Sequence, residues 1–129
     1  MELETPKKIF IVDDDTMLTD ALTDFLTRKT PHQIHVFNTG EECLSHLAEK
    51  PDLIILDYYL NSVQKDAANG MEILQVIKKH YPGLHVIMLS SQERYAIALQ
   101  TIQKGAEQYV VKDGEAFGKI AAMIKDLSI

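Results

Sequence analysis

Carboxylate, hydroxyl and ammonium side chains follow four of the short apolar segments in this sequence. They are Asp13, Asp14 and Asp15 after Ile9–Val12, Asp57 after Leu53–Leu56, Ser90 and Ser91 after Val86–Leu89, and Lys112 after Tyr109–Val111. At the carboxyl ends of parallel strands they would share one edge of the sheet, where open α/β sheets bind ligands. Crowded carboxylates repel unless a cation balances them, and their oxygens suit a hard ion such as Mg2+. With a lysine and a serine donor added, the set indicates a site for a phosphoryl group on a metal ion.

Each of these residues also has a purely structural alternative. Asp13–Asp15 fit the cap of a following helix, since Asp is a favoured N-cap, although three aspartates are more than one cap needs. Ser90 and Glu93 fit a capping box. Taken singly, Asp57 could open a turn, Tyr109 could be a half-buried strand residue, and Lys112 could be a solvated surface lysine. The joint placement favours a site, because independent caps need not supply complementary charge.

Five short apolar runs alternate with segments of helical period, which predicts a parallel sheet covered by helices on both faces. The runs are Ile9–Val12, Ile34–Phe37, Leu53–Leu56, Val86–Leu89 and Tyr109–Val111. Thr39 and Glu42 predict a capping box for the second helix, Pro82 and Gly83 end the third, and Ser90 opens the fourth. The predicted inward-facing residues are Met17, Leu18, Ala21, Leu22, Phe25 and Leu26; Cys43, Leu44, Leu47 and Ala48; Ile73, Leu74 and Ile77; Ala98, Leu99 and Ile102; and Phe117, Ile120, Ala121, Ile124 and Leu127.

Composition narrows the class of protein. The 129 residues are 46% hydrophobic and 25% charged, which predicts one globular domain over residues 1–129, and we expect no second domain in this chain. The net charge of −6 and the lack of a basic run argue against direct nucleic-acid binding. The single Cys43 fits a reducing compartment. No apolar stretch is long enough for a membrane span or a signal peptide, so we expect a cytoplasmic protein.

The ordered motifs resemble the receiver domain of bacterial two-component response regulators. The resemblance covers about Lys8 to Leu127 and rests on Ile11–Asp15, Leu56–Asp57, Gly70–Leu74, Met88–Ser91, and Gly105–Ala106 leading into Tyr109–Lys112. Each piece is common, but the set at these intervals is specific. The resemblance implies a three-layer, doubly wound (βα)5 fold of the flavodoxin-like kind, with five parallel strands in the order 2-1-3-4-5.

The resemblance also implies a role for each site residue. Asp57 would be the phosphoacceptor that attacks the phosphorus of a phosphohistidine. Asp14, Asp57 and the backbone carbonyl of Tyr59 would ligate Mg2+ directly, and Asp13 largely through water. Lys112 and Ser90 would contact phosphoryl oxygens, and Tyr109 would turn inward with Ser90 as a switch. The residues that would flank the phosphoryl group are Tyr59, Ser91 and Gln92.

The implied partners are a histidine kinase or a histidine phosphotransfer protein. The surface of the fourth helix, fifth strand and fifth helix would carry the output, and it would also form a phosphorylation-dependent homodimer. The chain would catalyse only its own phosphorylation and dephosphorylation. Two rivals stay open: a pseudo-receiver that is never phosphorylated, and a haloacid-dehalogenase-like phosphatase, whose first motif Asp13-x-Asp15 resembles. No Gly-x-Gly-x-x-Gly follows the first run, which argues against dinucleotide binding.

Two departures from the family pattern stand out. Asp113 follows Lys112 where the family usually has Pro, so a cis peptide bond is not expected there. The segment after Asp57 is about five residues longer than usual and runs through Asn61–Asn69. This insertion is either a partner contact or a tolerated surface loop, and the second is favoured.

Overall fold

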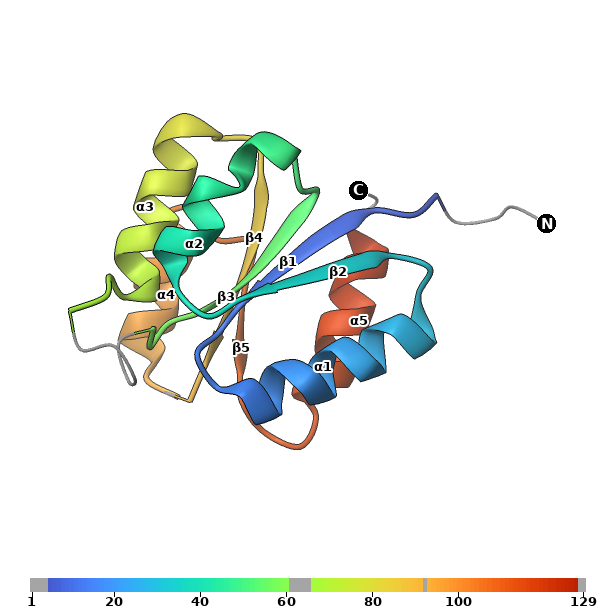
Figure 1. Cartoon of the computed structure of the whole chain (residues 1–129). Coiled ribbons are helices and arrows are strands. Elements are labelled where there is room, and N and C mark those ends of the chain that lie inside the picture. Colours follow the sequence, from blue (N-terminus) through green and yellow to red (C-terminus); the bar gives the residue numbers. More distant parts are fainter. Residues whose placement is uncertain (1–4, 61–65, 92, 128–129) are drawn as a thin grey trace.

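The computed structural model describes residues 5–60, 66–91 and 93–127, and these residues form one three-layer α/β unit (Figure 1). In chain order the elements are β1 (Lys8–Val12), α1 (Thr16–Lys29), β2 (Gln33–Phe37), α2 (Gly40–Ser45), the 3-10 turn η1 (Leu47–Glu49), β3 (Leu53–Asp57), α3 (Gly70–His80), β4 (His85–Ser90), α4 (Tyr95–Gln103), β5 (Gln108–Val111) and α5 (Ala116–Asp126). The strands pair in parallel in the order β2-β1-β3-β4-β5. The predicted fold class and strand order are confirmed.

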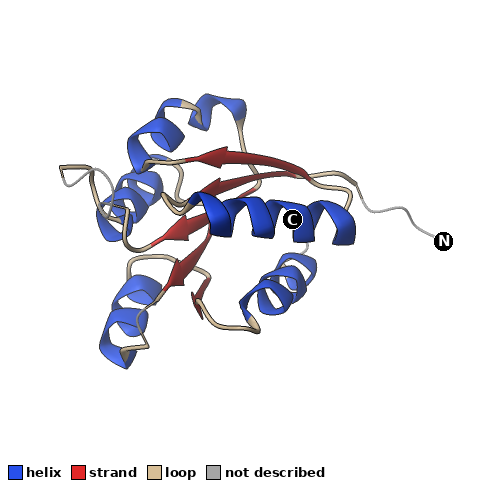
Figure 2. Cartoon of the chain, turned by 60° about the horizontal axis from the view of Figure 1, so that its bottom comes forward, coloured by secondary structure: helices blue, strands red, loops and turns tan. Residues whose placement is uncertain are grey.

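Alternate residues of the central strands supply two separate cores, one on each face of the sheet. Phe10, Ile54 and Val86 belong to the core beneath α2 and α3. Their neighbours Ile9 and Ile55 belong to the core beneath α1 and α5. Figure 2 shows helices on both sides of the sheet. Because β1, β3 and β4 are apolar on both faces, they lie in the middle of the sheet, and their carboxyl ends meet at one edge.

Side-chain caps begin three of the helices. Asp15 accepts a hydrogen bond from Leu18 N–H at the start of α1. Thr39 accepts one from Glu42 N–H at the start of α2, as predicted. A full capping box stands at α3, where the side chains of Asn69 and Glu72 each accept from the other residue's N–H. The Asn-x-x-Glu signature of that box is visible in the sequence but was not among the predicted caps.

The prediction that Ser90 opens the fourth helix is wrong. Ser90 is the last residue of β4 and pairs with Val111 in β5, and its carbonyl accepts a hydrogen bond from Lys112 N–H at 2.8 Å. Strand pairing therefore extends one residue beyond the apolar run. The helix α4 starts only at Tyr95, and its N-cap residue Arg94 makes no side-chain cap.

Several predicted inward positions are exposed. The buried stripe of α1 consists of Thr19, Leu22 and Leu26, so Met17 and Ala21 fall outside it, and Met17 is 83% exposed. Ala48 is exposed because α2 ends at Ser45 and the 3-10 turn η1 shifts the helical phase. On α4, Leu99 and Ile102 are 44% and 41% exposed. There the buried residue is Thr101, whose hydroxyl is satisfied within the helix by Ala98 O at 2.8 Å.

The segment after β3 is held against the sheet at both ends. Leu60 is fully buried in the core beneath α2 and α3. Gly70 N–H donates to Tyr58 O at 2.8 Å, and a Cβ atom on Gly70 would fall 2.2 Å from Asp57 O. Only a glycine allows α3 to approach the end of β3 this closely. Part of the predicted insertion, residues 61–65, lies outside the described residues; near its other end, Ala68 N–H donates to the Glu41 carboxylate on α2.

Candidate functional site

The parallel strands deliver the predicted polar residues to one edge of the sheet. Asp13 follows β1, Asp57 ends β3, Ser90 ends β4, and Lys112 follows β5. One carboxylate oxygen from each of Asp13, Asp14 and Asp57 lies within 4.8 Å of the other two. Asp13 and Asp57 are 0% and 2% exposed, so their charges are almost out of water. The structure therefore brings together the acidic residues that the sequence singled out.

Lys112 bridges the two buried carboxylates. Its ammonium nitrogen Nζ lies 3.0 Å from Asp13 Oδ2 and 3.2 Å from Asp57 Oδ1. Backbone donors supply the other contacts, since Asp15 N–H donates to Asp13 Oδ1 at 2.9 Å and Tyr59 N–H to Asp57 Oδ1 at 3.3 Å. The lysine side chain is itself only 20% exposed, which strengthens its attraction to the carboxylates relative to a surface ion pair.

One ammonium does not neutralise this cluster. Burial, followed by repulsion from Asp13, raises the pKa of Asp57 from 3.8 to about 7, although Lys112 and the Tyr59 N–H act in the opposite direction. Burial alone would lower the pKa of Lys112, but attraction to Asp57 and Asp13 outweighs it and raises that pKa. The two buried carboxylates of Asp13 and Asp57 share the one ammonium of Lys112, which leaves an excess of negative charge between them.

The donor set fits a divalent, oxygen-seeking cation. The buried Asp13 Oδ2 faces the Lys112 ammonium at 3.0 Å and has no further hydrogen-bond donor in the described part of the chain. Such an atom gains from a metal ion or from an ordered water on a metal ion. All three clustered ligands are carboxylates, which Mg2+ prefers over nitrogen or sulfur ligands.

The predicted switch residues lie together beside this cluster. Ser90 is fully buried, and Tyr109 on β5 is half-buried. Their side chains share a hydrogen bond, while burial raises the pKa of the Tyr109 hydroxyl. Of the predicted flanking residues, Tyr59 is half-buried with its ring 4.8 Å from that of Tyr58, and Ser91 is exposed. Gln92 lies outside the described residues.

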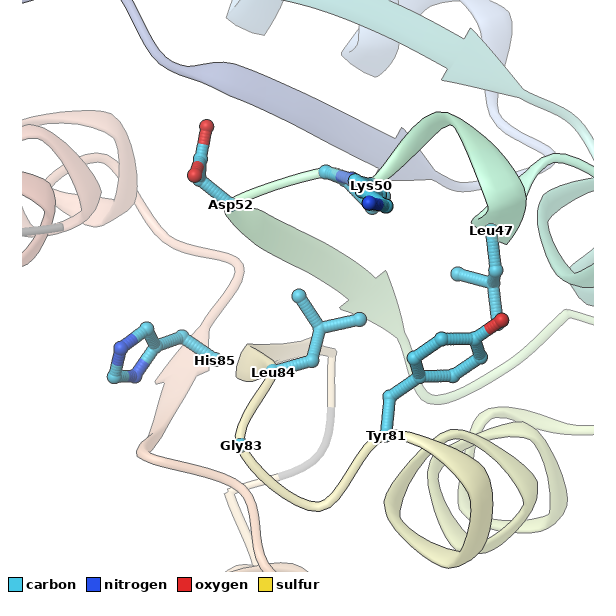
Figure 3. A pocket seen from close by; sticks show the side chains of 8 residues that line it. Leu47, Lys50, Asp52, Tyr81, Gly83, Leu84 and His85 are labelled. Atoms are coloured by element: carbon cyan, nitrogen blue, oxygen red, sulfur yellow. The ribbon is translucent and has the colours of Figure 1, made fainter.

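An open pocket of about 410 Å³ lies at the opposite end of the sheet from this site (Figure 3). The residues that line that pocket include Leu47, Tyr81, Leu84, Asp52 and His85. Asp52 and His85 stand at the amino-terminal ends of β3 and β4, whereas the acidic cluster stands at the carboxyl ends. The pocket therefore contributes nothing to the acidic site.

The raised pKa of Asp57 predicts a pH-dependent stability. The pKa of Asp57 is about 7 in the folded state, above the ordinary value of 3.8 that applies to the unfolded chain. Protonated Asp57 therefore stabilises the metal-free fold at low pH, and this contribution is lost as pH rises through about 7. Asp57→Asn removes the titration. The measurement is urea unfolding in EDTA. The unfolding free energy of Asp57→Asn minus that of the original protein should increase by on the order of a few kcal/mol from about pH 5 to about pH 8.

The exposed Asp20 on α1 provides the matched control. The difference between Asp20→Asn and the original protein should stay constant over the same pH range. A constant difference for Asp57→Asn as well would contradict a raised pKa at Asp57.

Comparison with known proteins agrees with this geometry. The family model of the response regulator receiver domain matches residues 9–125. The chemotaxis protein CheY of Thermotoga maritima is 25% identical over 120 residues, which are 92% of this chain and 96% of CheY. The probable C4-dicarboxylate response regulator DctR of Bacillus subtilis is 34% identical over 81% of this chain, but that match spans only 45% of DctR. The putative NtrX-like response regulator of Rickettsia bellii is 33% identical, with 21% of its length covered.

Solved structures give the same result. A receiver domain of DrrB, described as BeF3 activated, superposes with a TM-score of 0.81 at 27% identity, covering 95% of this chain and 97% of that one. A CheY-like receiver domain protein from Methanospirillum hungatei superposes with a TM-score of 0.82 at 24% identity, covering 96% and 94%. No helix in the described part of the chain has the length and apolar character to cross a membrane. The chain belongs to the response regulator receiver domain family, and its function is that of a receiver domain in two-component signalling.

Proposed function

We propose that Asp57 is the phosphoacceptor of this receiver domain and that a histidine kinase or a histidine phosphotransfer protein supplies the phosphoryl group. The observation that carries the proposal is the ion pair of Lys112 with Asp57, at 3.2 Å, inside a cluster of three carboxylates. A structural ion pair needs one carboxylate for one ammonium. A surplus of buried acid beside a lysine suits a site completed by a cation and an anion.

The proposed reaction follows from the positions of the groups. A carboxylate oxygen of Asp57 forms a bond to phosphorus while the phosphorus–nitrogen bond of the phosphohistidine breaks, and the electron pair leaves with the imidazole. Lys112, already 3.2 Å from Asp57, offsets negative charge on the phosphoryl oxygens. Mg2+ held by Asp13, Asp14, Asp57 and the carbonyl of Tyr59 would supply further positive charge to the same oxygens. Catalysis by this domain is then limited to its own phosphorylation and dephosphorylation.

The switch rests on the hydrogen bond between Ser90 and Tyr109. A phosphoryl oxygen on Asp57 would compete for the Ser90 hydroxyl, because a charged acceptor forms the stronger hydrogen bond. Such competition gives the phosphorylated state contacts that the other state lacks, as any switch requires. Tyr109 lies on β5, so a change in its position alters the surface formed by α4, β5 and α5. We propose that the domain signals in the cytoplasm through this surface.

The exposed apolar residues of α4 support a partner at this surface. Tyr95, Leu99 and Ile102 are 79%, 44% and 41% exposed, which is unusual for large apolar side chains on one helix. We propose that a second copy of the chain binds here after phosphorylation. Sedimentation velocity should show a dimer for the phosphorylated protein, and Leu99→Asp should return it to the monomer. A monomer in both states would contradict this part of the proposal.

Phosphorylation of Asp57 is tested by incubating the protein with Mg2+ and acetyl phosphate and measuring the intact mass. We expect one phosphoryl adduct that requires Mg2+, is absent from Asp57→Ala and is retained by Asp20→Ala. Lys112→Ala should slow adduct formation by about 100-fold, because it removes a preorganised positive charge. An adduct on Asp57→Ala, or no adduct under conditions that label a known receiver domain, would contradict the proposal.

A further inference from the structure

The loop between β5 and α5 determines where Lys112 can reach. Lys112 leaves the sheet with its N–H still donating to Ser90 O at 2.8 Å. Its side chain then has to place Nζ between Asp13 and Asp57, at 3.0 and 3.2 Å. A lysine side chain has many rotamers, so the direction of its backbone limits how often Nζ occupies this position.

Asp113 makes three hydrogen bonds in this loop. Its N–H donates to Val111 O at 2.9 Å, its Oδ1 accepts from Glu115 N–H at 2.9 Å, and its carbonyl accepts from Ala116 N–H at 3.2 Å. Asp113 itself is exposed, and Glu115, the N-cap residue of α5, makes no side-chain cap. The Asp113 carboxylate thus satisfies one of the free N–H groups at the start of α5.

Proline, which the family usually has at this position, could provide only the bond from its carbonyl to Ala116 N–H. It has no N–H for Val111 O and no side-chain acceptor for Glu115 N–H. The described residues contain no cis peptide bond, as predicted from the absence of proline here. The loop of this chain is therefore held by the hydrogen bonds of Asp113, on the residue directly after the lysine.

We propose that Asp113 is a positioning residue for Lys112: its N–H and its carboxylate fix the backbone on both sides of the loop, so that Nζ stays between Asp13 and Asp57. The proposal rests on the proposed function in one respect, namely that Lys112 assists phosphoryl transfer. A small displacement of such a charge from the reacting group costs a large part of its effect. Loss of the Asp113 bonds should therefore slow the reaction without removing any reacting group.

The test compares Asp113→Ala, Asp113→Asn and Asp113→Pro with Glu115→Ala. Asn keeps both the N–H and a side-chain oxygen, Ala keeps only the N–H, and Pro keeps neither. Glu115→Ala is the matched control, because it removes one acidic side chain from the same loop. The only described contact of that side chain is a 3.8 Å ion pair with Lys119. The rate of phosphorylation by acetyl phosphate is measured at saturating Mg2+.

We expect Asp113→Ala to slow phosphorylation by about 3- to 10-fold, the scale of losing one capping hydrogen bond. Asp113→Asn and Glu115→Ala should stay within about twofold of the original rate, and Asp113→Pro should be at least as slow as Asp113→Ala. The proposal would be overturned if Asp113→Ala or Asp113→Pro were phosphorylated as fast as the original protein. A rate in Asp113→Asn as low as in Asp113→Ala would also overturn it, because charge rather than hydrogen bonding would then be the cause.

A second measurement does not depend on phosphorylation. The side-chain ammonium of Lys112 is observed by nitrogen-15 NMR in the metal-free protein, where its ion pairs slow exchange with water. Its signal should be retained in Asp113→Asn and Glu115→Ala and broadened in Asp113→Ala. Equal signals in all variants would overturn the positioning role. Broadening without any adduct in the original protein would refute the proposed phosphoryl transfer and leave the positioning of Lys112 supported.

Discussion

The contact of the Lys112 ammonium with two buried carboxylates is the interaction on which the rest of the site depends. Asp13 and Asp57 are 0% and 2% exposed, and without the lysine at 3.0 and 3.2 Å they would face each other unscreened. The parallel sheet brings these residues to one place, since β1, β3 and β5 end at the same edge. Backbone donors from Asp15 and Tyr59 hold the carboxylates in place.

The lysine does not balance all of the negative charge at this contact, and the remaining charge favours the binding of a cation. Two buried carboxylates share one ammonium, and the pKa of Asp57 stays raised, at about 7, despite the lysine. A cation would lower the energy of this arrangement, and on the proposed function an anion bound to that cation would lie near Lys112 and the Ser90 hydroxyl. The surrounding fold packs closely against the strand ends. Gly70 lets α3 pack directly on Asp57 O, and Leu60 is buried in the core behind it.

Much of this could be predicted from the sequence, because apolar strand runs and strand-end charges are local signals. All five strands and the gathering of Asp13, Asp14 and Asp57 agree with prediction. The errors arose where tertiary pairing or a change of helical phase decides. Ser90 belongs to β4 because β5 pairs with it, and Leu99 and Ile102 are exposed because Thr101 takes the buried position of α4. The hydrogen bonds of Asp113 depend on loop geometry, which no periodic pattern reveals.

Binding of Mg2+ tests most directly the claim that the acidic cluster is an incomplete, cation-seeking site. The thermal unfolding midpoint is followed against Mg2+ concentration for the original protein, for Asp13→Asn combined with Asp14→Asn, and for Asp20→Asn on the exposed face of α1. We expect a saturable rise for the original protein and for Asp20→Asn, since an ion that binds the folded state stabilises it by mass action, and no saturable rise for the double variant. The same rise in all three proteins, or none in the original, would contradict that claim.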